Sequence, residues 1–139
     1  MQTIVCAVDE SPGAAEAIGV AAGLSKRLGL RLVLAHVVDG FRRTSGTQLG
    51  GLQAHQAGQR VLELIARTHN LESAADRRAE VGDRASELSR IAGEEAAVLI
   101  VIGSHRRFRR GRGRLGRLSA ELRSTAPCPV VVVPPRPLG

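Results

Sequence analysis

The chain is almost without aromatic residues. Its 139 residues include two phenylalanines, Phe41 and Phe108, and neither tryptophan nor tyrosine. Proteins that bind single-stranded nucleic acid without sequence preference stack bases on aromatic side chains, and this chain has little with which to do so. No sequence motif of a nucleic-acid reader is present either. The sequence therefore argues against a nucleic-acid partner.

Long apolar runs and cysteines are also scarce. No stretch approaches the roughly 18 apolar residues of a membrane span, and the chain begins Met1-Gln2-Thr3 without a basic and apolar leader. We therefore expect a soluble, cytoplasmic protein with no membrane partner. The two cysteines, Cys6 in an apolar run and Cys128 between prolines, resemble small packing residues in a reducing compartment, so we expect no disulfide.

The usual catalytic and metal-binding patterns are missing as well. No Ser-His-Asp or Cys-His arrangement can be argued, and no phosphate-binding G-x4-G-K-[ST] loop occurs. The G-x-G-x-x-G run at Gly111–Gly116 does not directly follow a strand, so it is not a dinucleotide fingerprint. We predict no metal ligands, because the histidines are scattered without metal spacing: His36, His55, His69 and His105.

Short apolar runs of Val, Leu, Ile and Ala alternate with segments of helical periodicity. This alternation predicts one α/β domain over residues 1–139, a three-layer α/β/α sandwich around a five-stranded parallel sheet. The expected strands are 3–8, 31–38, 76–81, 98–102 and 129–133. The expected helices are 11–28, with Ser11 as its cap, 52–69, 84–95 and 118–125. In the second helix, we expect an apolar face that includes Leu52, Val61, Leu62, Leu64 and Ile65.

Positive charge is concentrated in one segment. The net charge is +7, and seven arginines lie between Arg106 and Arg117. The rest of the chain is balanced. Such a cluster indicates either a local anionic partner or an exposed, solvated loop.

The Arg-rich segment also contains part of a recognisable motif, beginning where the fourth predicted strand ends. Gly103 and Gly116 match the first and third glycines of G-x2-G-x9-G-[ST], the nucleotide loop of the universal stress protein family. Arg106 replaces the middle glycine, and Arg117 replaces the hydroxyl residue. The resemblance extends over the whole chain through Val8-Asp9-Glu10-Ser11, His36-Val37-Val38-Asp39, Val81-Gly82-Asp83, Ile102-Gly103-Ser104-His105 and Ala126-Pro127-Cys128-Pro129-Val130.

This resemblance implies an adenine nucleotide, ATP or a related one, with Mg²⁺ as a candidate companion. It implies that the first and fourth strands are central neighbours, that Asp9 lies beside the ribose and adenine, and that the Val37 backbone reads the adenine edge. The candidates near phosphate are Gly103, Arg106, Gly116, Arg117 and Ser119. Arg106 either blocks the phosphate path or pairs with phosphate. Without a ligand, Asp9 would be a helix-terminal charge, Val37 a core residue and Gly103 a turn glycine. Ser119 would then face solvent or bond a backbone carbonyl.

The leading hypothesis is therefore a nucleotide-binding module of the universal stress protein type, used for sensing or regulation in the stress response, with at most slow ATP hydrolysis. The alternative is the same fold with a lost pocket, acting as a dimeric interaction protein through the Arg-rich loop. A third hypothesis, nucleic-acid binding by that loop, is disfavoured by the lack of aromatics.

The last predicted strand suggests how copies assemble. Four consecutive valines, Val130 to Val133, would leave an apolar strip and unpaired backbone groups at a sheet edge. Pairing with the same strand of a second copy about a two-fold axis would cover both, and the family resemblance implies such dimers. We expect a homodimer formed through this strand.

Overall fold

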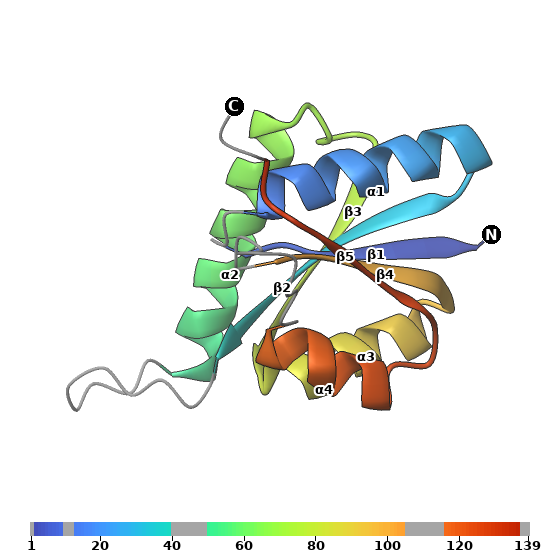
Figure 1. The fold of residues 1–139 in the computed structure, drawn as a ribbon. Coiled ribbons are helices and arrows are strands. Elements are labelled where there is room, and N and C mark those ends of the chain that lie inside the picture. The colour runs from blue at the N-terminus through green and yellow to red at the C-terminus, as the bar shows by residue number, and fades with distance from the viewer. Residues whose placement is uncertain (1, 10–12, 40–49, 105–115, 137–139) are drawn as a thin grey trace.

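The computed structural model describes residues 2–9, 13–39, 50–104 and 116–136. In these residues, strands and helices alternate (Figure 1). The strands are β1 (Thr3–Ala7), β2 (Arg31–Asp39), β3 (Ala75–Gly82), β4 (Ala97–Gly103) and β5 (Val130–Val133). The helices are α1 (Ala14–Leu28), α2 (Gly51–Thr68), α3 (Arg84–Glu94) and α4 (Arg117–Thr125).

All strands belong to one sheet with the order β3-β2-β1-β4-β5, and every neighbouring pair is parallel. The predicted five-stranded parallel sheet is therefore confirmed, with β1 and β4 as central neighbours. The polar β3 and the valine-rich β5 form its two edges, as their sequences indicated.

Helices cover both faces of the sheet, which gives the three predicted layers (Figure 1). Alternate residues of the same strand enter different cores, because successive side chains of a strand point to opposite faces. In β1, Ile4 packs on the side of α1 and α2, whereas Val5 packs on the side of α3 and α4. The largest helical contributors are Ile18 and Leu62 on the first side, and Leu88, Ile91 and Leu122 on the second.

The cysteines are free, as expected. Cys6 is fully buried in the core beside α1. Burial, with a smaller contribution from the charge of Asp9, raises the pKa of the Cys6 thiol to about 12. Cys128 is partly buried, which also raises its pKa. Neither thiol is therefore activated for chemistry.

The structure corrects the expected apolar face of α2. Leu52 and Leu64 are 72% and 62% exposed, although their spacing suggested that they faced the core. The buried face consists of Ala54, Gly58, Leu62 and Ala66, which are four residues apart. A Cβ at Gly58 would lie 3.2 Å from the Ala79 Cβ and 3.3 Å from Val38 Cγ2. Helix and sheet therefore approach too closely at Gly58 for a larger side chain, whereas Leu62, one turn further on, still fits into the core.

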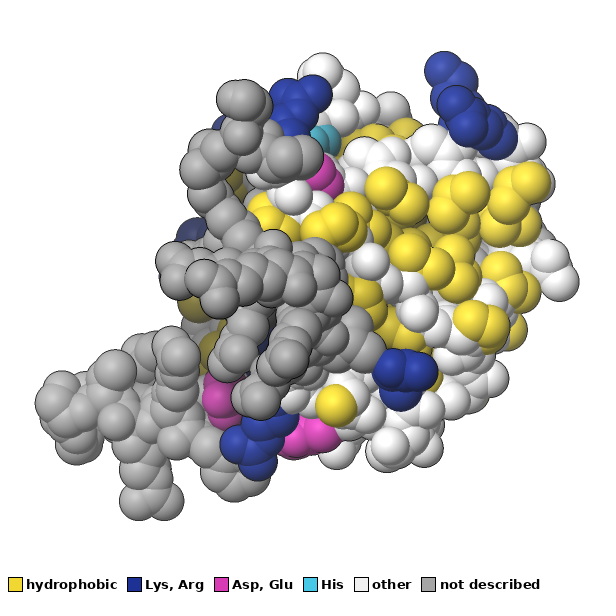
Figure 2. Space-filling model, in the orientation of Figure 1, with side chains coloured by type: hydrophobic (Ala, Val, Ile, Leu, Met, Phe, Trp, Pro, Cys, Tyr) yellow, Lys and Arg dark blue, Asp and Glu magenta, His cyan; other side chains and the backbone are white. Residues whose placement is uncertain are grey.

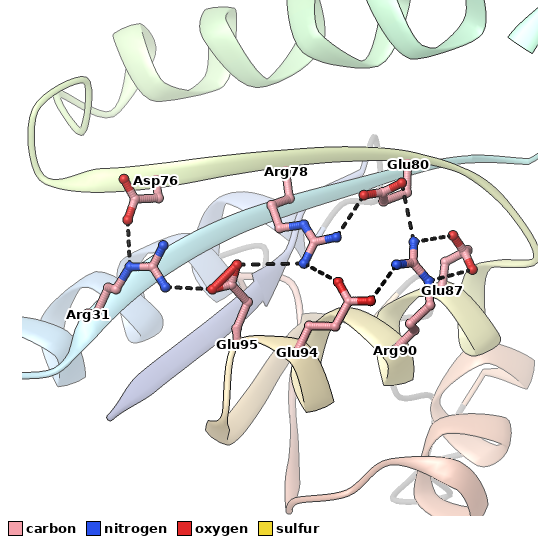
Figure 3. Close-up of polar contacts among 8 residues, drawn as sticks. All are labelled: Arg31, Asp76, Arg78, Glu80, Glu87, Arg90, Glu94 and Glu95. Atoms are coloured by element: carbon pink, nitrogen blue, oxygen red, sulfur yellow. Dashed lines mark hydrogen bonds and ion pairs between the residues drawn. The ribbon is translucent and has the colours of Figure 1, made fainter. Parts of the chain in front are cut away.

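The outer part of the sheet on the α3 side is covered by charged groups instead of an apolar core. Here Arg31, Asp76, Arg78 and Glu80 from β2 and β3 meet Glu87, Arg90, Glu94 and Glu95 at α3 (Figure 3). Arg78 lies at the centre, 2.8 Å from both Glu80 Oε1 and Glu94 Oε1. Hydrogen bonding to Glu80 is the main reason that the pKa of Arg78 is raised. The contacts with Arg78 and Arg90 lower the pKa of Glu94.

The helices in the described ranges all lack the combination of length and apolarity that crossing a membrane requires.

Candidate functional site

The candidate site lies at the carboxyl end of the sheet, between β1 and β4. The connection that leaves β1 passes through α1 on one face, and the connection that leaves β4 leads to α4 on the other. Because these connections diverge, this is the topological switch point at which open parallel sheets bind ligands.

Asp9 follows β1 at this point, and its side chain is only 17% exposed. Its Oδ2 accepts a hydrogen bond from Nη2 of Arg84, the first residue of α3, at 2.6 Å. The two residues lie 75 positions apart in the sequence. The Asp9 carboxylate is thus a partly buried charge that α3 neutralises.

Val37 occupies a position where its side chain and its backbone have different roles. The side chain is 7% exposed and belongs to the core beneath α3 and α4. The Val8 N–H donates to the Ala35 carbonyl at 2.8 Å, so the backbone N–H and C=O of Ala35 point toward β1. Val37, two residues further, directs its N–H and C=O to the same side, beyond the last residue of β1. Its backbone groups therefore face the switch point.

The absence of a side chain at Gly103 has a clear structural reason. A Cβ there would lie 2.6 Å from the Gly13 carbonyl carbon and 2.8 Å from the Ala14 nitrogen. A Cβ at Gly13 would in turn lie 2.8 Å from both the Ser104 nitrogen and the Val133 oxygen. Gly13 is also the N-cap of α1, without a side-chain cap, so the helix begins later than expected; Ser11 lies outside the described residues. The end of β4 and the start of α1 are thus in direct backbone contact.

The start of α4 supplies unsatisfied hydrogen-bonding groups. Gly116 is the N-cap, and among the described residues no side chain caps the helix. The first amide groups of a helix have no intrahelical acceptor. Ser119 is 4% exposed. Within the part of the chain that the structure describes, its hydroxyl has no hydrogen-bond partner. A buried hydroxyl of this kind needs an acceptor or donor from elsewhere.

Arg117 extends from the same helix into solvent. Its side chain is 94% exposed, and its Nε pairs with Glu121 Oε1 at 3.0 Å on the same helix. Arg117 is also one of the residues that line a cleft beside the start of this helix. The other candidate arginine, Arg106, and His105 lie outside the described residues.

A cleft of about 380 Å³ lies beside these groups. Among the described residues, it is lined by Asp39, Asp83, Arg84, Ala85, Arg117, Leu118 and Glu121. Asp83 caps α3 by accepting hydrogen bonds from the N–H and Oγ of Ser86, at 3.0 and 2.8 Å. These bonds, together with the charge of Arg117, lower the pKa of the Asp83 carboxyl. The cleft thus combines acidic and basic groups on adjoining helix starts.

A larger cleft, of about 430 Å³, lies between α2 and β3 and is lined by His55, Gln59, Leu62, Glu63 and residues 77–80. It contains none of the predicted site residues and lies on the edge of the sheet, so the switch point remains the candidate site. Three or more metal-ligating side chains do not gather anywhere within the described ranges.

The structure thus brings Asp9, the Val37 backbone, Gly103, Gly116 and Ser119 to one end of the sheet. Sequence reasoning missed Arg84. The only local signal was its place directly after the cap residue Asp83 at a helix start. Its pairing with Asp9 depends on the packing of α3 beneath the centre of the sheet.

Comparisons with known proteins agree with this geometry. A family model described as the universal stress protein family matches residues 1–134. A protein of that family from Burkholderia pseudomallei is 30% identical with a TM-score of 0.72, and the match covers 97% of this chain and 96% of that one.

Two more distant structures were determined with nucleotides. A universal stress protein from Archaeoglobus fulgidus in complex with dAMP is 21% identical, with a TM-score of 0.62 and coverage of 96% of this chain and 98% of that one. A universal stress protein in complex with cAMP is 19% identical, with a TM-score of 0.68 and coverage of 97% and 98%. No curated protein sequence matches this chain significantly.

Proposed function

Since the chain belongs to the universal stress protein family, we propose that it binds an adenine nucleotide, ATP or a related one, at the switch point between β1 and β4. Binding would serve a sensing or regulatory role in the stress response, in the cytoplasm. We assign a binding role rather than an enzymatic one, with ATP hydrolysis at most slow.

The observation that carries the proposal is the buried Ser119 hydroxyl at the start of α4, which has no hydrogen-bond partner among the residues that the structure describes. Amide groups in the first turn of a helix favour anions through their hydrogen bonds and through the helix dipole. A phosphate there would satisfy the hydroxyl and the free amides together. Mg²⁺ would accompany the phosphates when ATP is the ligand.

The rest of the nucleotide has matching groups on the other side of the switch point. Ribose hydroxyls are donors, and Asp9 is an acceptor held in place by Arg84. An adenine edge needs uncharged donors and acceptors, which the outward-facing Val37 backbone offers. The relatives bound to dAMP and cAMP support an adenine nucleotide as the ligand class.

Calorimetry with ATP tests the proposal. We expect Ser119→Ala to weaken ATP binding about 10-fold to 150-fold, because a hydrogen bond to a charged group contributes roughly 1.5–3 kcal/mol. Ser124→Ala is the matched control, because Ser124 is exposed on the same helix and bonds only the Ala120 carbonyl. An unmodified protein that binds no ATP at millimolar concentration would refute the proposal.

The alternative function is favoured by a different observation. The described part of the cleft has three acidic residues, Asp39, Asp83 and Glu121, against two arginines, and Arg117 already pairs with Glu121. This excess of acidic groups would disfavour a phosphate in the cleft and would leave the Arg-rich loop as the binding surface for an acidic protein. In that case the unmodified protein binds no nucleotide, and its affinity for the acidic protein falls steeply with salt. Replacing Arg109 and Arg110 with serine should then abolish that binding.

We also propose that the protein is a homodimer formed through β5. The Pro129 carbonyl accepts a hydrogen bond from the N–H of Ile100 in β4 at 3.0 Å, and the Val133 carbonyl accepts one from the N–H of Ser104, which directly follows β4, at 2.8 Å. Val130 and Val132 alternate with them and therefore direct their N–H and C=O to the open edge. Hydrophobic side chains also gather over α1 and β5, where Val20 is 38% exposed (Figure 2). A second copy would cover both features.

A further inference from the structure

The pairing of Asp9 with Arg84 places two different recognition groups side by side. Asp9 Oδ2 and Arg84 Nη2 are 2.6 Å apart, and the two side chains are 17% and 34% exposed. Arg84 also lines the cleft of about 380 Å³ that lies next to the switch point. A ligand that reaches Asp9 would therefore meet a guanidinium immediately beside it.

Arg84 retains donors for such a ligand. A guanidinium has five N–H groups, and in the described part of the chain its only side-chain partner is Asp9. The nearby Asp83 carboxylate is engaged by Ser86, and its charge is partly offset by Arg117. The carboxylates of Asp9 and Asp83 are thus both partnered, and Arg84 itself is one of the residues that line the cleft.

A carboxylate next to a guanidinium complements a hydroxyl next to an anion. The carboxylate accepts from the hydroxyl, and the guanidinium donates to phosphate oxygens in its fork geometry. In dinucleotide-binding folds, an acidic residue binds a free ribose 2′-hydroxyl, or a nearby arginine accommodates a phosphate at that position. If Asp9 contacts a ribose hydroxyl, Arg84, whose Nη2 is 2.6 Å from Asp9 Oδ2, is close enough to meet a group on the neighbouring ribose oxygen.

We propose that the Asp9–Arg84 pair selects adenine nucleotides in which one ribose hydroxyl is free and its neighbour carries a phosphate ester. The inference rests on the proposed function, because it assumes that Asp9 faces the ribose. The 3′,5′-cyclic monophosphate, the 3′-monophosphate and the 2′-monophosphate share this chemistry. A nucleotide phosphorylated only at the 5′ position lacks it.

The test is calorimetry on the purified full-length chain with four probes: 5′-AMP, 3′-AMP, 2′-AMP and 3′,5′-cyclic AMP. We expect at least one of the last three to bind the unmodified protein about tenfold tighter than 5′-AMP. The one that binds most tightly identifies the position of the phosphate. Arg84→Gln should reduce the preference over 5′-AMP to about twofold or less, and Arg84→Lys should keep part of it, because the charge remains without the planar fork.

The matched control is Arg123→Gln, which removes one positive charge from an exposed arginine of α4 and should leave the preference unchanged. Circular dichroism establishes whether each variant is folded. If Arg84→Gln does not fold, Arg84→Lys provides the test, and its preference over 5′-AMP should be smaller than that of the unmodified protein. Equal affinity of the unmodified protein for all four probes, or a preference that survives both Arg84 variants, would overturn the selectivity but not nucleotide binding. If no probe and no ATP bind, the proposed function fails, and the selectivity fails with it.

Discussion

Replacing Gly103 with alanine should strongly destabilise the protein even when no nucleotide is present. The new Cβ would lie 2.6 to 2.8 Å from three backbone atoms of Gly13 and Ala14. Carbon atoms are normally about 3.5–4.0 Å apart in packed interiors, so the start of α1 would have to move by roughly 1 Å. Gly13 cannot easily yield, because it is itself packed against the Ser104 and Val133 backbone.

The magnitude follows from the atoms in conflict. Adding a methyl group to a well-packed core typically costs 1–3 kcal/mol when side chains can adjust. Here the opposing atoms are backbone atoms of a helix start, and the loss should lie at the upper end, about 3 kcal/mol. In a domain of this size, that corresponds to a melting temperature lower by roughly 10 °C.

Urea denaturation of the nucleotide-free protein, monitored by circular dichroism, measures this loss. Gly23→Ala is the matched control: Gly23 lies within α1, and a Cβ there has nothing within 4 Å. Alanine in the helix interior should stabilise the protein by about 0.5–1 kcal/mol. If Gly103→Ala unfolds at the same urea concentration as the unmodified protein but loses nucleotide binding, Gly103 serves the ligand and the packing argument is wrong.

Three further predictions concern charge and assembly. Arg78→Ala should lower the free energy of unfolding by about 1–2 kcal/mol, because Arg78 is at the centre of a partly buried network of ion pairs (Figure 3). Arg117→Ala, which removes an exposed ion pair, should change it by less than about 0.5 kcal/mol. Equal losses of stability in the two variants would contradict this. The lowered pKa of Asp83 means that its charge stabilises the fold above about pH 4 and that this contribution is lost as the pH falls through the folded value. Asp83→Ala should therefore be less stable than the unmodified protein at pH 7, with a difference that narrows in acid; a difference independent of pH would refute the cap. Val132→Lys should shift a dimer towards monomer in light scattering, and a monomeric unmodified protein at tens of micromolar would exclude the β5 dimer.

The sequence alone determined the architecture. Continuous apolar runs predicted buried parallel strands, and the alternating helical segments required crossovers on both faces. It also placed β3 at an edge, because Asp76, Arg77 and Arg78 leave little apolar surface on that strand. The expected boundaries agree closely with the observed ones, since glycines, prolines and helix caps act locally.

Tertiary structure decided which residues meet. The leucine pattern of α2 was misleading, because Ala54 and Gly58 let that helix approach the sheet more closely than a leucine-rich face would allow. Gly103 resembled a ligand-binding glycine in the sequence, and only the packing of α1 on β4 shows that a side chain has no room there. The Asp9–Arg84 pair joins residues 75 positions apart. Such contacts depend on how the helices pack on the sheet. Periodicity and local propensity act over a few residues, so they do not predict which distant residues meet.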